Sequence, residues 1–269
     1  MFLTHKAENS VEYLSSTIIK SPHAFSTRMG GVSRLDHTSS LNLAFNRGDD
    51  RDTVIENLAR FGKAVGFDEK KVISLPQIHS TTVIEADAQM AGEGYFKESH
   101  TSCDGYVANE KGIVLGVKTA DCVPVLLEAE DESGEIIAVA ALHAGWRGTV
   151  AGIAAEGVKV LVKKGADPKK IRAAIGPAIS SCCFEIGQDV VDEMNAQNVG
   201  APFEMRAFSK NGRLYADLKA INREFLASCG VMPENIDVCE ECTFCLEKKY
   251  YSHRRMKGQR GTMLSVIWM

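Results

Sequence analysis

The chain has 269 residues, of which 45% are hydrophobic and 25% are charged, close to average globular usage. Its formal net charge of −4 and its pI near 6.0 argue against a general nucleic-acid-binding or membrane-binding surface. No apolar run approaches the ~18 residues of a membrane-spanning helix, and no apolar signal segment follows the first residues. We therefore expect a cytoplasmic protein whose eight irregularly spaced cysteines are thiols.

Helical and extended patterns are interspersed along the chain. Apolar residues recur at helical spacing over residues 51–66, with Asp52 as the predicted N-cap and Gly66 at the end. Short apolar runs predict strands at 112–118, 122–128, 136–142, 171–176, 235–240 and 263–269. Further helices are predicted at 149–164, 188–198 and 217–229. Because the order is not a strict βαβ alternation, we predict a mixed α/β (α+β) fold, a single-domain multilayer sandwich of mixed sheets and helices over residues 1–269.

The candidates for chemistry lie in the segments LPQIHS (75–80), TADCVP (119–124) and LHAGWRG (142–148). Each segment places one good metal ligand, His79, Cys122 or His143, at the edge of an apolar run. Separations of 43 and 21 residues suit ligands from different elements of a folded scaffold rather than a local finger. Two imidazoles and a thiolate suit zinc, with the fourth tetrahedral position open, and copper accepts the same ligands. Taken singly, each residue also fits a structural role in the core.

Seven motifs follow one another in the order found in the YfiH-like family: FSTRMGGVS (25–33), SLNLAFNRGDD (40–50), QIHS (77–80), TADCVPVLL (119–127), HAGWRGT (143–149), IGPAISSCCFEIG (175–187) and YSHRR (251–255). This family was long described as polyphenol oxidases or laccase-domain proteins and was later reassigned to purine nucleoside phosphorylases with adenosine deaminase activity. The chain resembles it from about residue 24 to about residue 267. The resemblance implies that His79, Cys122 and His143 match the family's metal-binding residues.

The resemblance also implies the reaction. Adenosine, inosine or methylthioadenosine would react with phosphate, the co-substrate, to give a purine base and ribose 1-phosphate, and adenosine would also be deaminated to inosine. Purine nucleosides and phosphate are thus the expected partners, with no nucleic acid or membrane, while the oligomeric state is not indicated. Zinc lowers the pKa of a bound water toward ~7, and Asp121, next to Cys122, is the candidate proton shuttle. The alternative for Asp121 is a cap on the kink at 119–122.

The HAGWRG segment is the candidate phosphate site. It leads into a predicted helix, whose N-terminal amides and positive dipole end favour an anion. Gly145 and Gly148 would allow the backbone to approach the anion, and Arg147 can contact two of its oxygens at once. Trp146 would either stack on the purine or pack in the core.

Arg28, His253 and Arg254 are further candidates for substrate contact, although a charged run such as 253–255 is also typical of a solvated face. Two positions depart from the family pattern. The usual Gly-Arg pair near the C-terminus is replaced by GQRGTM (258–263), where Arg260 lies two places upstream. Asn46-Arg47 stands where His-Val is more usual, so no inherited role is assigned to Arg47.

A second cysteine pattern competes for metal. Cys239, Cys242 and Cys245 form a C-x2-C-x2-C run with His253 eight residues on, similar to the start of an iron–sulfur motif. The fourth cysteine expected nearby is missing, so the first site is favoured. The adjacent Cys182-Cys183 pair is interpreted as packing or as an oxidation-prone surface.

Three alternative functions remain open from the sequence. A copper-dependent polyphenol oxidase would need several coppers, but the chain shows one His/Cys/His set and no repeated H-x-H pairs. A cysteine hydrolase would use Cys122 with a histidine. A non-catalytic metal-binding protein would not need an open coordination position beside an anion-binding loop.

Overall fold

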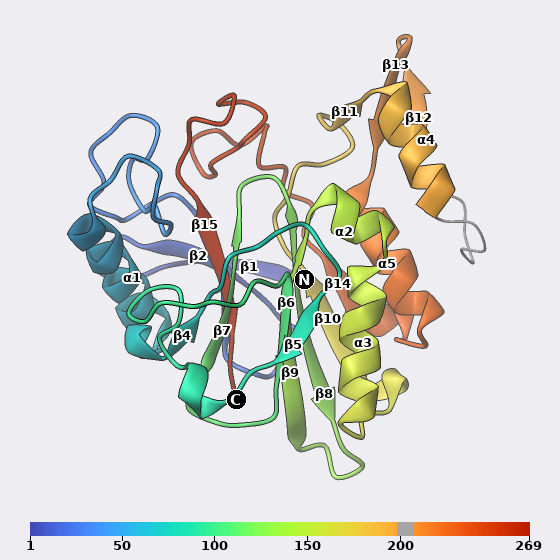
Figure 1. Ribbon diagram of the computed structural model, residues 1–269, viewed down its shortest axis with the longest axis horizontal. Helices are drawn as coiled ribbons and strands as arrows, with labels where there is room; N and C mark the ends of the chain where they lie inside the picture. Colours follow the sequence, from blue (N-terminus) through green and yellow to red (C-terminus); the bar gives the residue numbers. More distant parts are fainter. Residues whose placement is uncertain (198–206) are drawn as a thin grey trace.

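The computed structural model describes residues 1–197 and 207–269, and its strands form two six-stranded sheets and one three-stranded sheet (Figure 1). The first sheet has the order β1-β2-β3-β15-β7-β4. Its strands span Phe2–Lys6, Glu12–Ser16, His23–Ser26, Met263–Ile267, Val114–Thr119 and Val72–Ile73, respectively. All neighbours are antiparallel except β4 and β7, which are parallel.

The second sheet has the order β14-β10-β8-β9-β6-β5. Its strands span Ile236–Val238, Ile171–Ile175, Val123–Glu130, Ile136–Ala144, Gly105–Ala108 and Val83–Glu85, respectively. The two outer pairs are parallel and the inner pairs are antiparallel, so this sheet is mixed as well. The small sheet orders β11 (Glu185–Ile186), β13 (Arg213–Ala216) and β12 (Ala207–Lys210).

Helices cover the outer faces of the two large sheets. Their bounds are α1 Arg51–Val65, α2 Trp146–Val150, α3 Ile153–Lys163, α4 Gln188–Gln197 and α5 Leu218–Ser228. Short 3-10 helices span Glu69–Lys71, Ala88–Met90, Pro168–Lys170 and Pro233–Asn235. Figure 1 shows α1 on one side of the sheets and α3 with α5 on the other. The predicted multilayer sandwich of mixed sheets and helices is confirmed, and no described helix is long and apolar enough to span a membrane.

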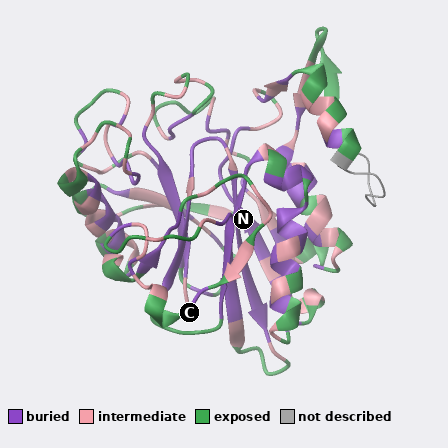
Figure 2. Cartoon of the chain, viewed as in Figure 1, coloured by how far each residue is buried: buried purple, intermediate pink, exposed green. Residues whose placement is uncertain are grey.

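The core consists of layers because side chains alternate along the strands. On β9, Val139 and Ala141 face the core between the two large sheets, whereas Ala140 and Leu142 belong to the core under α3 and α5. A third core joins α1 to the outer face of the first sheet. Figure 2 shows the central strands buried almost throughout. Burial on both faces explains why these strands appear in the sequence as continuous apolar runs.

Two local expectations need correction. Helix α1 is capped by Asp50, whose carboxylate accepts from the Thr53 amide at 2.7 Å, and not by Asp52, while Gly66 ends the helix as predicted. The predicted helix 149–164 is two helices, because Gly152, at φ +85°, separates α2 from α3. Of the predicted helix 188–198, residue 198 lies outside the described residues.

The apolar runs at 112–118 and 122–128 lie in different sheets. They form β7 of the first sheet and β8 of the second, so the step at residues 120–122 carries the chain from one sheet to the other. Cys122 stands at this crossing.

Candidate metal centre and its cavity

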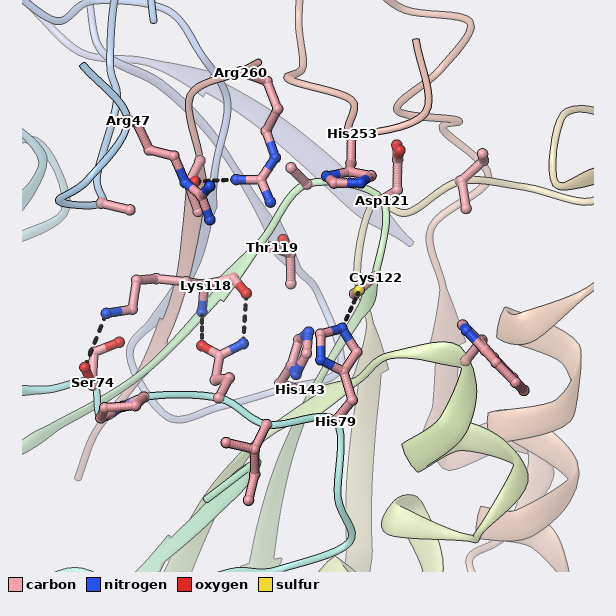
Figure 3. A pocket seen from close by; sticks show the side chains of 18 of the residues that line it. Arg47, Ser74, His79, Lys118, Thr119, Asp121, Cys122, His143, His253 and Arg260 are labelled. Atoms are coloured by element: carbon pink, nitrogen blue, oxygen red, sulfur yellow. Dashed lines mark hydrogen bonds between the residues drawn. The ribbon is translucent and has the colours of Figure 1, made fainter. Parts of the chain in front are cut away.

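The structure brings His79, Cys122 and His143 together. Their ligand atoms all lie within 4.8 Å of one another. The Nε2 of His79 is 3.8 Å from the Sγ of Cys122, and the two imidazole rings cross at 81° with centroids 4.9 Å apart. Figure 3 shows the three side chains converging on one point. Zinc–ligand bonds of 2.0–2.3 Å at tetrahedral angles separate nitrogen from sulfur by about 3.6 Å, so this donor set fits zinc.

Sheet pairing positions two of these ligands. Pro124 of β8 pairs with His143 of β9, which places Cys122, two residues before Pro124, beside the end of β9. His79 comes from the loop between β4 and β5 and adopts a φ of +61°. Asp121, next to Cys122, has a φ of +96°. Such conformations are uncommon for residues other than glycine and concentrate at functional sites.

Asp104, which the sequence analysis missed, connects the histidine ligands. Its buried carboxylate accepts from Nδ1 of His143 at 2.8 Å and from the backbone amides of His79 at 2.9 Å and Ser80 at 2.7 Å. Burial raises the pKa of Asp104, but the hydrogen bonds from His143 and Ser80 outweigh it and lower the pKa to about 2. The one available signal was an acidic residue directly before the apolar strand 105–108.

The contacts of Asp104 prepare the site for metal. A carboxylate on Nδ1 orients His143 with Nε2 toward Cys122. Burial lowers the pKa of His143, but the charge of Cys122 and the hydrogen bond to Asp104 raise it to about 9, so a metal ion would displace the proton from Nε2. Burial raises the pKa of the Cys122 thiol, but the charge of His143 and hydrogen bonds to both histidines lower it to about 6. Cys122 is therefore a thiolate, the form that binds metal, at neutral pH.

The glycines of HAGWRG allow close packing against the loop that carries His79. A Cβ on Gly145 would lie 2.4 Å from Cδ2 of His79, and one on Gly148 would lie 2.8 Å from the carbonyl oxygen of Ser80. The backbone thus approaches the loop that carries His79. Helix α2, which Gly145 precedes, has only five residues.

A cavity of about 970 Å³ opens beside the three ligands. Its other wall carries the cationic side chains of Arg47, Lys118 and Arg260 (Figure 3). The Nε atoms of Arg47 and Arg260 are buried and have no hydrogen-bond partner among the described residues. Burial and the charge of Arg47 lower the pKa of Lys118 to about 8 and that of Arg260 to about 10. Arg47 stands where the family usually has another residue, and Arg260 lies two places upstream of the usual arginine. The sequence alone therefore gave no reason to place either of them in the site.

The predicted substrate residues are distributed unevenly around this cavity. Asp121, His253 and Arg254 line it, whereas Arg28 is not among the described residues that do. The guanidinium of Arg28 instead donates to the carbonyl oxygen of Ser39 at 2.7 Å and packs on a tyrosine ring.

The carboxylate of Asp121 forms hydrogen bonds with residues 243–254, within and after the C-x2-C-x2-C run. It accepts from the hydroxyls of Thr243 at 2.6 Å and Ser252 at 2.9 Å, and from the amide of Arg254 at 2.7 Å. The side chain of Arg254 extends to the carbonyl oxygen of Glu185 at 2.8 Å. Asp121 therefore fixes one wall of the cavity.

Arg147 lies at the rim of the cavity. Its side chain is 56% exposed, pairs with Glu193 at 3.6 Å and covers the ring of Trp146 at 4.1 Å. Trp146 itself is half-buried, lines the cavity and packs against the core under α3 and α5.

Comparison with known proteins identifies the family. The family model described as multi-copper polyphenol oxidoreductase laccase matches residues 22–269. The chain belongs to this family, whose members include the YfiH and YlmD proteins. The solved structure of YlmD from Geobacillus stearothermophilus matches with a TM-score of 0.87 and 31% identity over 95% of both chains.

Two relatives in the YfiH-like family have names that state an activity. Purine nucleoside phosphorylase of Deinococcus radiodurans is 39% identical over 246 residues, which cover 91% of this chain and 88% of that protein. Adenosine deaminase RL5, from an unknown prokaryotic organism, is 32% identical over 252 residues, which cover 93% of this chain and 95% of that protein. The sequence-based family prediction is confirmed.

Proposed function

We propose that this protein is a zinc-dependent purine nucleoside phosphorylase that also deaminates adenosine. The observation that carries the proposal is the arrangement of the cavity, which has a His/Cys/His ligand set on one wall and cationic side chains without carboxylate partners among the described residues on the other. The names of the relatives agree with this arrangement. A cavity of about 970 Å³ has room for a nucleoside and a phosphate.

His79, Cys122 and His143 would hold the zinc ion, with Asp104 orienting His143. Bound zinc lowers the pKa of a coordinated water and thereby supplies a nucleophile at neutral pH. Asp121 remains our candidate for proton transfer, since it lines the cavity next to Cys122. Its three hydrogen bonds to residues 243–254 also make it a positioning residue for that wall.

Phosphate has two candidate positions. Arg147 can contact an anion from the rim, but it is largely exposed and already paired with Glu193. Arg47 and Arg260 line the cavity, and no described carboxylate pairs with either guanidinium. Two guanidinium groups without such a partner attract an anion more strongly than one that is already paired, so we favour this pair for the attacking phosphate. Arg254, His253 and Trp146, which line the cavity, would contact the nucleoside.

Two other functions make different predictions. A multicopper oxidase needs several copper sites, and the described residues bring together one His/Cys/His group and one group of four cysteines. A cysteine hydrolase is favoured by one observation, the lowered pKa of Cys122 beside two imidazoles. Such an enzyme would work without metal.

The test is incubation of pure, metal-analysed protein with adenosine, with and without phosphate, followed by separation of the products. We expect adenine and ribose 1-phosphate only with phosphate, and inosine in both cases. Arg260→Gln should lower the phosphate-dependent rate by roughly 10–100-fold more than inosine formation, because a charge-assisted contact to the attacking anion is lost. Arg34→Gln, at an exposed position outside the cavity, is the matched control.

Selective loss in Arg147→Gln but not in Arg260→Gln would place the phosphate at the rim. Equal loss of both activities in Arg260→Gln would show that Arg260 supports the cavity and not the anion. Absence of both adenosine products from zinc-loaded protein would contradict the proposed function.

A further inference from the structure

Four cysteine thiols meet in a second cluster. The Sγ atoms of Cys182, Cys183, Cys242 and Cys245 all lie within 4.8 Å of one another. The Sγ of Cys245 is 3.3 Å from that of Cys183 and 3.7 Å from that of Cys182. The sequence interpretation of these cysteines was incomplete, because the C-x2-C pair is joined by two thiols from about 60 residues earlier.

The first cysteine of the C-x2-C-x2-C run, Cys239, is not part of this cluster. Cys239 is buried in the core between the two large sheets. Instead, Cys182 and Cys183, which the sequence suggested were packing residues or an oxidation-prone surface, lie beside Cys242. A separation of about 60 residues hides this arrangement from any local spacing rule.

The backbone holds the two cysteine segments side by side. Ala178 and Cys242 form an isolated parallel bridge, and the amide of Thr243 donates to the carbonyl oxygen of Ala178 at 3.1 Å. The amide of Ser180 donates to the Sγ of Cys242 at 3.4 Å. Amide donors to a ligating sulfur are the typical outer shell of a thiolate metal site.

The geometry points to a structural zinc ion bound by Cys182, Cys183, Cys242 and Cys245. Zinc–sulfur bonds of about 2.3 Å at tetrahedral angles separate neighbouring sulfurs by about 3.8 Å, which agrees with the observed spacings. Four thiolates complete the coordination and leave no position for water, as in structural zinc sites. A cluster of several irons would need the sulfurs further apart.

This ion would connect two segments that border the cavity. Phe184, directly after the vicinal pair, lines the cavity. Thr243, between the other two cysteines, donates its hydroxyl to Asp121 at 2.6 Å. The proposed zinc therefore stabilises the wall that positions Asp121. This site shares no ligand with the His/Cys/His set.

The test counts zinc in a Cys122→Ser background, in which the first site is disabled. Purified under reducing conditions, this protein should still hold about one zinc per chain if the four-cysteine site is real. Adding Cys245→Ser should remove that zinc, because an exposed ligand is lost with little change to the core. Adding Cys229→Ser, a cysteine outside both groups, should leave it bound.

A second measurement does not depend on a variant. In wild-type protein the exposed thiols of Cys182 and Cys245 should resist a thiol reagent until a chelator is added. Immediate reaction before chelation would overturn the proposal. Equal zinc content in the Cys245→Ser and Cys229→Ser variants would also overturn it. So would iron in place of zinc, or a disulfide detected by mass spectrometry in protein freshly purified under reducing conditions.

Discussion

The carboxylate of Asp104 holds two of the three proposed zinc ligands through hydrogen bonds. It accepts hydrogen bonds from the ring of His143 and from backbone amides of the loop that carries His79. Gly145 contributes from the opposite direction by leaving room for the His79 ring. Neither residue is a ligand, yet the distance between the imidazoles depends on both. Residues that do not themselves bind the metal therefore decide whether the ligands meet.

We predict that Asp104→Asn lowers zinc affinity about 10–100-fold, the usual effect of removing the partner of a ligating histidine. The single oxygen of asparagine can replace only one of the two carboxylate oxygens. Oδ1 accepts from Nδ1 of His143 and the amide of His79, whereas Oδ2 accepts from the amide of Ser80, so the variant loses one of these two sets of hydrogen bonds. Competition with a metal chelator measures the affinity, and circular dichroism checks the fold. Glu98→Gln, an exposed position, is the control. Unchanged affinity would show that Asp104 serves folding alone.

At the scale of elements, the apolar runs predicted the main strands and the helices at α1, α4 and α5 from local pattern alone. The helix break at Gly152 was missed because apolar residues continue through it. The sequence also showed which side chains could bind metal, but not their partners. Asp104 reaches His143 because β6 pairs with β9, and this pairing depends on residues far apart in the chain.

The corrected cap of α1 can be tested directly. Asp50→Ala should lower the melting temperature by about 2–4 °C, because it removes the acceptor of the Thr53 amide. Asp52→Ala should have a smaller effect, since it removes only a charge near the helix N-terminus. An equal or larger effect of Asp52→Ala in thermal unfolding would restore the original assignment.

The pH dependence of this effect has a defined sign. Hydrogen bonds from Thr53 lower the pKa of Asp50 in the folded protein. The stabilisation is therefore full above the unfolded-state pKa, about 3.9, and is lost as the pH falls through the lower native value. The difference between wild type and Asp50→Ala should accordingly shrink below about pH 4.

Over the whole molecule, the three layered cores form without any residue of the His/Cys/His set. Cys122 directly precedes β8, His143 lies at the end of β9, and His79 lies in the loop between β4 and β5. These strands are held by sheet pairing and core packing, not by the metal. Zinc at this site should therefore add only several degrees to the melting temperature by preferring the native state. The overall layering was predictable from the sequence, whereas the four-cysteine cluster and the cationic wall required the three-dimensional structure.

The most direct test of the central claim is a zinc titration of chelated protein, with adenine and inosine formation and near-UV circular dichroism recorded on the same samples. Metal-free protein should keep its near-UV spectrum and lack both activities, and added zinc should restore both. Loss of the near-UV spectrum on chelation of the Cys245→Ser variant, whose remaining metal set is His79, Cys122 and His143, would make the zinc of that set structural. Full activity in verified metal-free protein would contradict the account and leave Cys122 as a nucleophile.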